Sequence, residues 1–86
     1  MSDVKLLSEP TNYAVVHLPD RRFPGIVFQG DSLHILIKDL EHVANEIDPL
    51  EKEAELAYVI ERLREVQAHY DAVLDREGIE PPYARD

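Results

Sequence analysis

The sequence predicts an α+β domain: a two- or three-stranded antiparallel β-hairpin followed by an antiparallel helical hairpin with a long second helix. Apolar residues alternate with a period of two before about residue 29 and recur every three or four residues after residue 32, which are the periods of strands and helices. The pair Asp48-Pro49 is typical of a second helix start. At 86 residues, the chain is expected to form a single domain.

The β part is expected to be a hairpin over about residues 11–29. The segment 13–18 is rich in β-branched residues and lies between turn-forming residues, as a strand does. The tripeptide Phe23-Pro24-Gly25 predicts a turn, and residues 26–28 predict a short buried strand. Residues 4–7 are either an edge strand or a loosely docked arm.

The first helix is expected to run from about residue 32 to residue 47. Gly30 is interpreted as a stop after the strand, and either Asp31 or Ser32 as the helix cap. Residues at spacings of three and four form one apolar stripe, namely Leu33, Leu36, Leu40, Val43 and Ile47. We expect the first half of the second helix to cover this stripe.

The second helix is expected over residues 49–77, with Asp48 as its N-cap and Gly78 as a left-handed cap at its C-terminus. A frayed tail is expected over residues 79–86. The helix has its own apolar stripe, formed by Leu56, Val59, Leu63, Val66, Tyr70 and Val73, with Ile60 and Leu74 beside it. Its second half, residues 66–74, extends past the first helix, so it must pack on the sheet or on another subunit, and we expect it to mediate self-association.

The composition excludes several kinds of protein. The chain has no cysteine, so it has no disulfide, no thiolate zinc site and no thiol nucleophile. No apolar run approaches the roughly 20 residues of a membrane span, and residues 1–10 lack the basic and apolar regions of a signal peptide. We therefore expect a cytoplasmic protein.

The net charge of −9 lies mainly in the helical half, where residues 31–77 carry thirteen acidic and five basic side chains. A surface of this sign repels nucleic-acid phosphates and anionic lipids, so neither nucleic acid nor membrane is an expected partner. A basic protein partner is favoured. The alternative is that the charge serves only solubility.

One face of the second helix is the candidate partner-binding site. The like-charged pairs Glu51/Glu55 and Glu61/Glu65 stand one turn apart, and each pair costs an isolated helix about 0.2 to 0.5 kcal/mol. This arrangement indicates an external use for the charge. Tyr58 lies among these carboxylates and could anchor an arginine-rich surface. The alternative is that Tyr58 is exposed only incidentally.

The sequence motifs do not indicate an enzyme. The tetrapeptide Gly30-Asp31-Ser32-Leu33 matches the nucleophile motif of a hydrolase class, and Asp39-x-x-His42 matches its acid–base motif. On one rigid helix, however, His42 would stand roughly 15 Å from the Ser32 hydroxyl, too far for proton transfer. We expect no catalytic residue and no cofactor. His42 and Glu46 stand one turn apart and could bind a metal, although a solvated pair is favoured.

One stretch of the sequence resembles a known family. Tyr13-Ala-Val-Val-His-Leu-Pro is followed by Arg21-x-Phe23-Pro24-Gly25-x-x-x-Gln29-Gly30-Asp31-Ser32-Leu33. Over roughly residues 4–48 the chain is similar to a group of small bacterial proteins known only as a domain of unknown function. The resemblance implies no assigned activity. Small proteins of this kind often accompany bacterial toxin and phage-conflict loci, which implies an immunity or inhibitor role by association.

We therefore expect a non-enzymatic acidic protein-binding module, of immunity or inhibitor type, that acts on a basic, nuclease-like partner. The alternative is a structural or scaffold protein that forms a homodimer through its second helix. The first function predicts that Tyr58, Glu61 and Glu65 are exposed in the free protein. The alternative predicts that Tyr58 and Ala68 are buried between two subunits.

Overall fold

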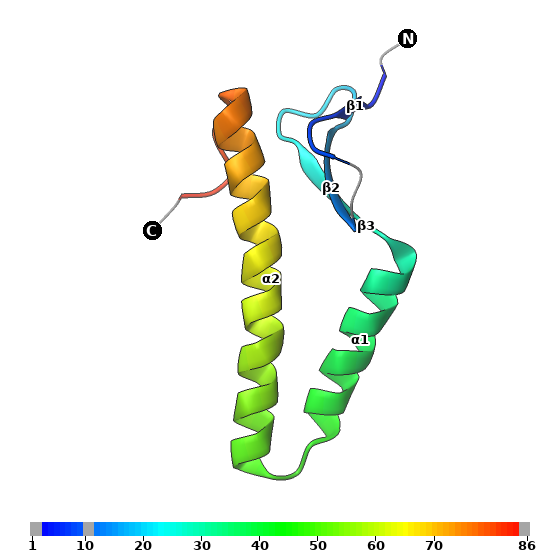
Figure 1. Cartoon of the computed structure of the whole chain (residues 1–86), viewed down its shortest axis with the longest axis vertical. Coiled ribbons are helices and arrows are strands. Elements are labelled where there is room, and N and C mark those ends of the chain that lie inside the picture. Colours follow the sequence, from blue (N-terminus) through cyan, green and yellow to red (C-terminus); the bar gives the residue numbers. More distant parts are fainter. Residues whose placement is uncertain (1–2, 10–11, 85–86) are drawn as a thin grey trace.

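In a computed structural model, which describes residues 3–9 and 12–84, three strands precede two helices (Figure 1). The elements are β1 Lys5–Leu6, β2 Tyr13–His17, β3 Gly25–Phe28, α1 Gly30–Asn45 and α2 Pro49–Glu77. The α+β class and the long second helix are confirmed. Residue 11, where the hairpin was expected to begin, and residues 85 and 86 of the expected tail lie outside the described residues.

The strands form one antiparallel sheet in the order β1-β2-β3. In its register Leu6 lies opposite Val16, and Tyr13 lies opposite Phe28. The segment around residues 4–7 therefore contributes an edge strand. The Ser8 hydroxyl accepts a hydrogen bond from the Val15 amide at 2.8 Å, which ties the end of this segment to the middle of β2.

The apolar core lies between this sheet and the C-terminal half of α2. Its buried members are Leu7, Val15, Tyr70, Val73 and Leu74. The Tyr70 hydroxyl donates a hydrogen bond to the Pro24 carbonyl at 2.7 Å, so the turn before β3 is also fixed to α2. The second half of the α2 stripe is thus covered by the chain's own sheet. The sheet therefore removes the reason for expecting this half to mediate self-association, because its apolar side chains are already covered.

The start of α1 differs from the prediction. The helix begins at Gly30 with Gln29 as N-cap, and no side chain caps it. Neither Asp31 nor Ser32 is therefore the cap. Both lie in the first turn, where the Asp31 carboxylate accepts a hydrogen bond from the Ser32 amide at 2.8 Å and favourably faces the positive end of the helix dipole.

The turn between the helices is held by carboxylates. Glu46 adopts an extended conformation and ends α1 two residues earlier than expected, because its side chain accepts hydrogen bonds from the Ile47 and Asp48 amides, both at 3.1 Å. Asp48 caps α2 by accepting from the Leu50 amide at 3.0 Å. The far end of α2 is closed by Gly78 at φ 72°. Both predicted caps of α2 are confirmed.

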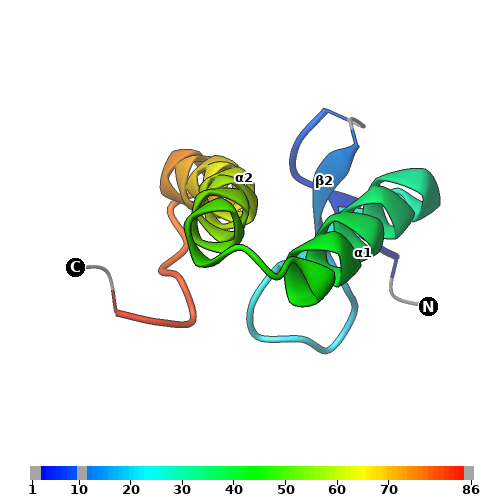
Figure 2. The same ribbon diagram turned by 90° about the horizontal axis from the view of Figure 1, so that it is seen from below.

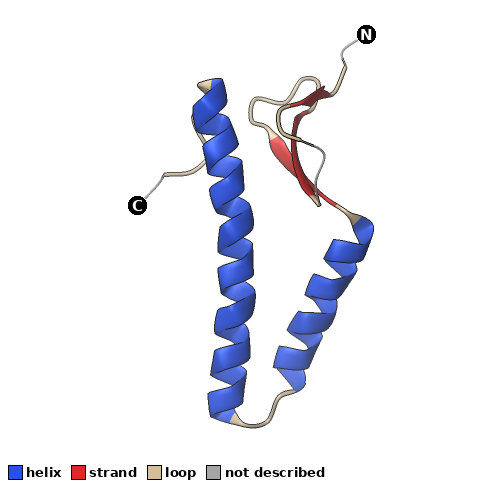
Figure 3. Cartoon of the chain, viewed as in Figure 1, coloured by secondary structure: helices blue, strands red, loops and turns tan. Residues whose placement is uncertain are grey.

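The two helices lie side by side at the turn and diverge away from it (Figures 1, 2 and 3). Val43 and Val59 are buried, at 7% and 2% exposed, whereas Leu33 and Leu40 remain 44% and 42% exposed. The expectation that α2 covers the α1 stripe is therefore wrong. The face that α1 turns toward α2 is rotated away from the centre of its apolar stripe. Among the described residues, no helix is long and apolar enough to cross a membrane.

Candidate functional site

A groove of about 260 Å³ lies between the two helices on one side of their contact. We call it the interhelical groove. Its lining residues are Asp39, His42 and Val43 from α1 and Ala54, Glu55, Tyr58 and Val59 from α2. The tight turn determines this set, because it brings residues that are about equally distant from it along the chain to face each other. The groove therefore combines an apolar floor, one aromatic wall and a charged rim.

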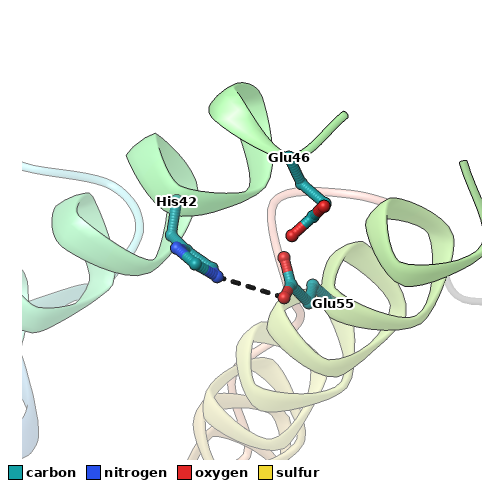
Figure 4. Close-up of side chains that lie close together, drawn as sticks. All are labelled: His42, Glu46 and Glu55. Carbon is teal, nitrogen blue, oxygen red and sulfur yellow. Dashed lines mark hydrogen bonds and ion pairs between the residues drawn. The ribbon is translucent and has the colours of Figure 1, made fainter. Parts of the chain in front are cut away.

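A histidine and two carboxylates meet near the turn (Figure 4). His42 Nε2 and Glu55 Oε1 are 3.1 Å apart, which joins α1 to α2 directly. The ligand atoms of His42, Glu46 and Glu55 all lie within 4.8 Å of one another. Imidazole nitrogen and carboxylate oxygen are typical ligands of divalent transition metals. These are the side chains in the described part of the chain that could hold such an ion.

The second carboxylate oxygen of Glu55 has a different environment. Glu55 Oε2 is buried and has no hydrogen-bond partner among the described residues. A buried acceptor without a donor is destabilising by about 1 to 3 kcal/mol, and more if it is charged. A donor that enters the groove could form a strong hydrogen bond with this oxygen once the partly exposed Glu55 side chain rotates to present it.

An arginine of α2 lies beside the groove, one helical turn after Tyr58. Arg62 Nη1 is 3.1 Å from Asp39 Oδ2, and both side chains are about one-third exposed. The same guanidinium lies 5.9 Å from the centre of the Tyr58 ring. A hydrogen bond with the Tyr13 side chain raises the pKa of Arg62. Arg62 thus links α2 to both α1 and β2, and it occupies one side of the Tyr58 ring.

The structure places the five predicted partner-binding residues on one side of α2. Tyr58 is 61% exposed and lines the groove with Glu55, which is half-buried. Glu51, Glu61 and Glu65 are exposed and lie outside the groove lining. Tyr58 and Glu55 therefore line the groove together. The other three residues, Glu51, Glu61 and Glu65, lie around them on α2, and we call these three the border carboxylates.

The sequence analysis did not identify the α1 side of the groove. Asp39 and His42 were considered only as parts of an enzyme motif or a metal pair, and Arg62 was not considered. The turn at Asp48 contained the necessary signal, because counting outward from it in both directions pairs His42 with Glu55 and Asp39 with Tyr58.

Comparisons with known proteins give a family but no activity. The sequence model of a family of unknown function, DUF6959, matches residues 1–83. No curated protein and no solved structure matches the chain. Its chemistry must therefore be inferred from its own residues.

Proposed function

Because the chain belongs to DUF6959, a family of unknown function, we propose its role from its own geometry. It is a non-enzymatic protein-binding module whose interhelical groove receives a cationic side chain of a basic protein partner. The observation that carries this proposal is the buried, unpartnered Oε2 of Glu55 at the edge of a groove with an aromatic wall.

The groove has the two features that bind a guanidinium or an ammonium group. Glu55 Oε2 offers a charge-assisted hydrogen bond, which is about twice as strong as a neutral one. The exposed ring of Tyr58 offers a surface over which a cation can lie. Arg62 already makes both contacts within the chain, with Asp39 and with the Tyr58 ring. A partner's arginine would repeat this arrangement one helical turn nearer to the connecting turn.

The charge around the groove supports a basic protein as the partner. Glu51, Glu61 and Glu65 are exposed on α2, and the whole chain carries a net charge of −9. Such a field accelerates association with a basic surface and contributes less to the lifetime of the complex. In this proposal the border carboxylates attract the partner, whereas Glu55 and Tyr58 hold it.

A bacterial immunity or inhibitor protein is the biological role that fits this chemistry best. The proposed target is a basic, nuclease-like protein, whose active site has cationic subsites for phosphate groups. Carboxylates can occupy such subsites and exclude the nucleic acid. In this role the protein acts by covering a surface and performs no reaction of its own.

Calorimetry with a defined probe tests the proposal. The probe is an acetylated and amidated arginine hexapeptide, titrated into the full chain with EDTA present so that no metal contributes. We expect Glu55→Gln to weaken binding about tenfold, because it removes a charge-assisted hydrogen bond. Tyr58→Ala should weaken it severalfold without changing the net charge.

The matched control is Glu53→Gln. Glu53 is exposed on the same helix and does not line the groove, so its substitution changes the net charge equally. We expect less than a twofold effect. Equal losses in Glu55→Gln and Glu53→Gln would mean that the peptide senses only net charge, and the groove would not be the site.

A further inference from the structure

The helical hairpin carries a second surface that the groove does not use. Six large apolar side chains remain between 39% and 45% exposed. We call them the apolar hairpin face: Leu33, Ile37 and Leu40 of α1, and Leu56, Ile60 and Leu63 of α2. All of them except Ile37 belong to the apolar stripes that the sequence predicted.

Helical geometry places all six on one side of the hairpin. At about 100° per residue, the three α1 members lie within about 60° of one another, and so do the three α2 members. On each helix, the buried contact residue, Val43 or Val59, separates these positions from the groove residues. Viewed from its own N-terminus, each helix carries its three residues on the same rotational side of its contact residue. Because the two helices are antiparallel and face each other, both groups of three residues point to the same side of the hairpin. The apolar hairpin face is therefore opposite the interhelical groove.

This face differs from the rest of the helical surface in charge. The arcs that contain the six side chains carry no aspartate or glutamate, although the chain has a net charge of −9. Two copies of so acidic a chain repel each other over most orientations. They can meet at the centre of the apolar hairpin face without apposing carboxylates, whereas a basic partner would find carboxylates only at its edge, at Glu41 and Glu53.

The exposed area is close to what a stable dimer requires. A fully exposed leucine or isoleucine is taken to have about 150 Å² of surface, which equals the smallest area that an aromatic side chain buries. The six side chains then leave about 400 Å² in water. A standard interface buries about 800 Å² per partner, and about 65% of a homodimer interface is apolar, so about 500 Å² of apolar surface is needed and these six side chains supply most of it.

We infer that a second copy of this chain covers the apolar hairpin face. A twofold axis would bring the face of one copy against the same face of the other, as in most homodimers. The four helices would then share one apolar layer, which the single chain lacks where α1 and α2 diverge. The inference does not depend on the proposed function, because the groove remains open on the opposite side of each hairpin.

Sedimentation equilibrium of the full chain, over about 1 to 100 µM, tests this assignment. We expect a dimer for the wild type. Ile37→Glu should raise the dimer dissociation constant by about 100-fold or more, since each copy would bury a carboxylate in the interface. Glu55→Gln should leave the dissociation constant unchanged, which separates this inference from the proposed function.

Ile35→Glu is the matched control. Ile35 is the same residue type on the same helix and is 51% exposed, but it lies about 160° around α1 from Ile37. Circular dichroism should show both variants folded, and Ile35→Glu should remain dimeric. A monomeric wild type would overturn the inference and would leave the face to a different protein. Equal dissociation constants for Ile37→Glu and Ile35→Glu would overturn it too.

Discussion

The two halves of α2 have the same apolar periodicity but different surroundings. In the C-terminal half, Val73 and Leu74 are 3% and 0% exposed and pack against the sheet. In the N-terminal half, Leu56 and Ile60, which stand fourteen residues before the buried Tyr70 and Leu74, are 42% and 41% exposed. The C-terminal half therefore supports the fold, while the N-terminal half presents the groove on one side and the apolar hairpin face on the other.

This difference shows that a stripe predicts a helix without predicting what covers it. The period of three and four residues is continuous along α2, yet only the sheet end is fully covered. At the hairpin end, the helices touch at Val43 and Val59 and then diverge. The surfaces available for recognition lie where the chain's own packing is least complete.

The largest expected effect compares one leucine from each half. Leu74→Ala leaves a cavity in a fully buried site and should lower the free energy of unfolding by about 2 to 5 kcal/mol. Leu56→Ala should lower it by less than about 1 kcal/mol when measured at concentrations below dimer formation. Urea denaturation at equilibrium measures both. Similar losses in the two variants would contradict the distinction between the halves.

A smaller effect is expected from the buried hydroxyl of the C-terminal half. Tyr70→Phe removes the donor to the Pro24 carbonyl and should lower the free energy of unfolding by about 1 to 3 kcal/mol, because a buried acceptor loses its partner. The matched variant Tyr58→Phe, at an exposed hydroxyl, should change it by less than about 0.5 kcal/mol. Thermal or urea denaturation at neutral pH distinguishes them.

The same residue gives the sheet end a pH dependence. Burial raises the pKa of Tyr70, so the folded state favours its protonated form. This contribution is fully present below the ordinary tyrosine pKa of about 10 and is lost as the pH rises through the higher folded value. Unfolding measured between about pH 9 and 12 should show a steeper alkaline loss of stability in the wild type than in Tyr70→Phe. Parallel curves would contradict this.

The smallest effects concern the N-terminal ends of the two helices. Asp48→Ala removes the side-chain cap of α2 and should lower the free energy of unfolding by about 1 kcal/mol. Ser32→Ala should change it by less than about 0.5 kcal/mol, because Ser32 is not a cap. Ser32→Ala also tests the absence of catalysis: an esterase activity that this substitution abolished would contradict the non-enzymatic proposal.

The sequence predicted the elements because each depends on local signals. The caps at Asp48 and Gly78, the hairpin strands and the length of α2 follow from turn chemistry and periodicity over short stretches. The exceptions are the two ends of α1: the helix ends at Asn45 rather than at residue 47, and at its start either Asp31 or Ser32 has the composition of a cap. The helix instead extends back to Gly30, which directly follows β3 with only Gln29 between them.

The candidate site was predicted less completely because it depends on how two helices approach each other. Periodicity along α2 identified Tyr58 and Glu55, but their function depends on which residues of α1 face them. That choice is made by the rotation of α1 about its axis, which brings Asp39 and His42 toward α2 and turns Leu33 and Leu40 toward solvent. Amphipathicity alone predicts that Leu33 and Leu40 face α2 together with Val43.

Nuclear magnetic resonance of the full chain tests the central claim most directly. The measurement is a series of ¹H–¹⁵N spectra during titration with the arginine hexapeptide in EDTA. We expect the largest shifts at His42, Glu55 and Tyr58, and we expect Glu55→Gln to abolish them while Glu53→Gln retains them. Shifts spread evenly over Glu51, Glu61 and Glu65, and unchanged in Glu55→Gln, would contradict the claim that the interhelical groove receives a cationic side chain.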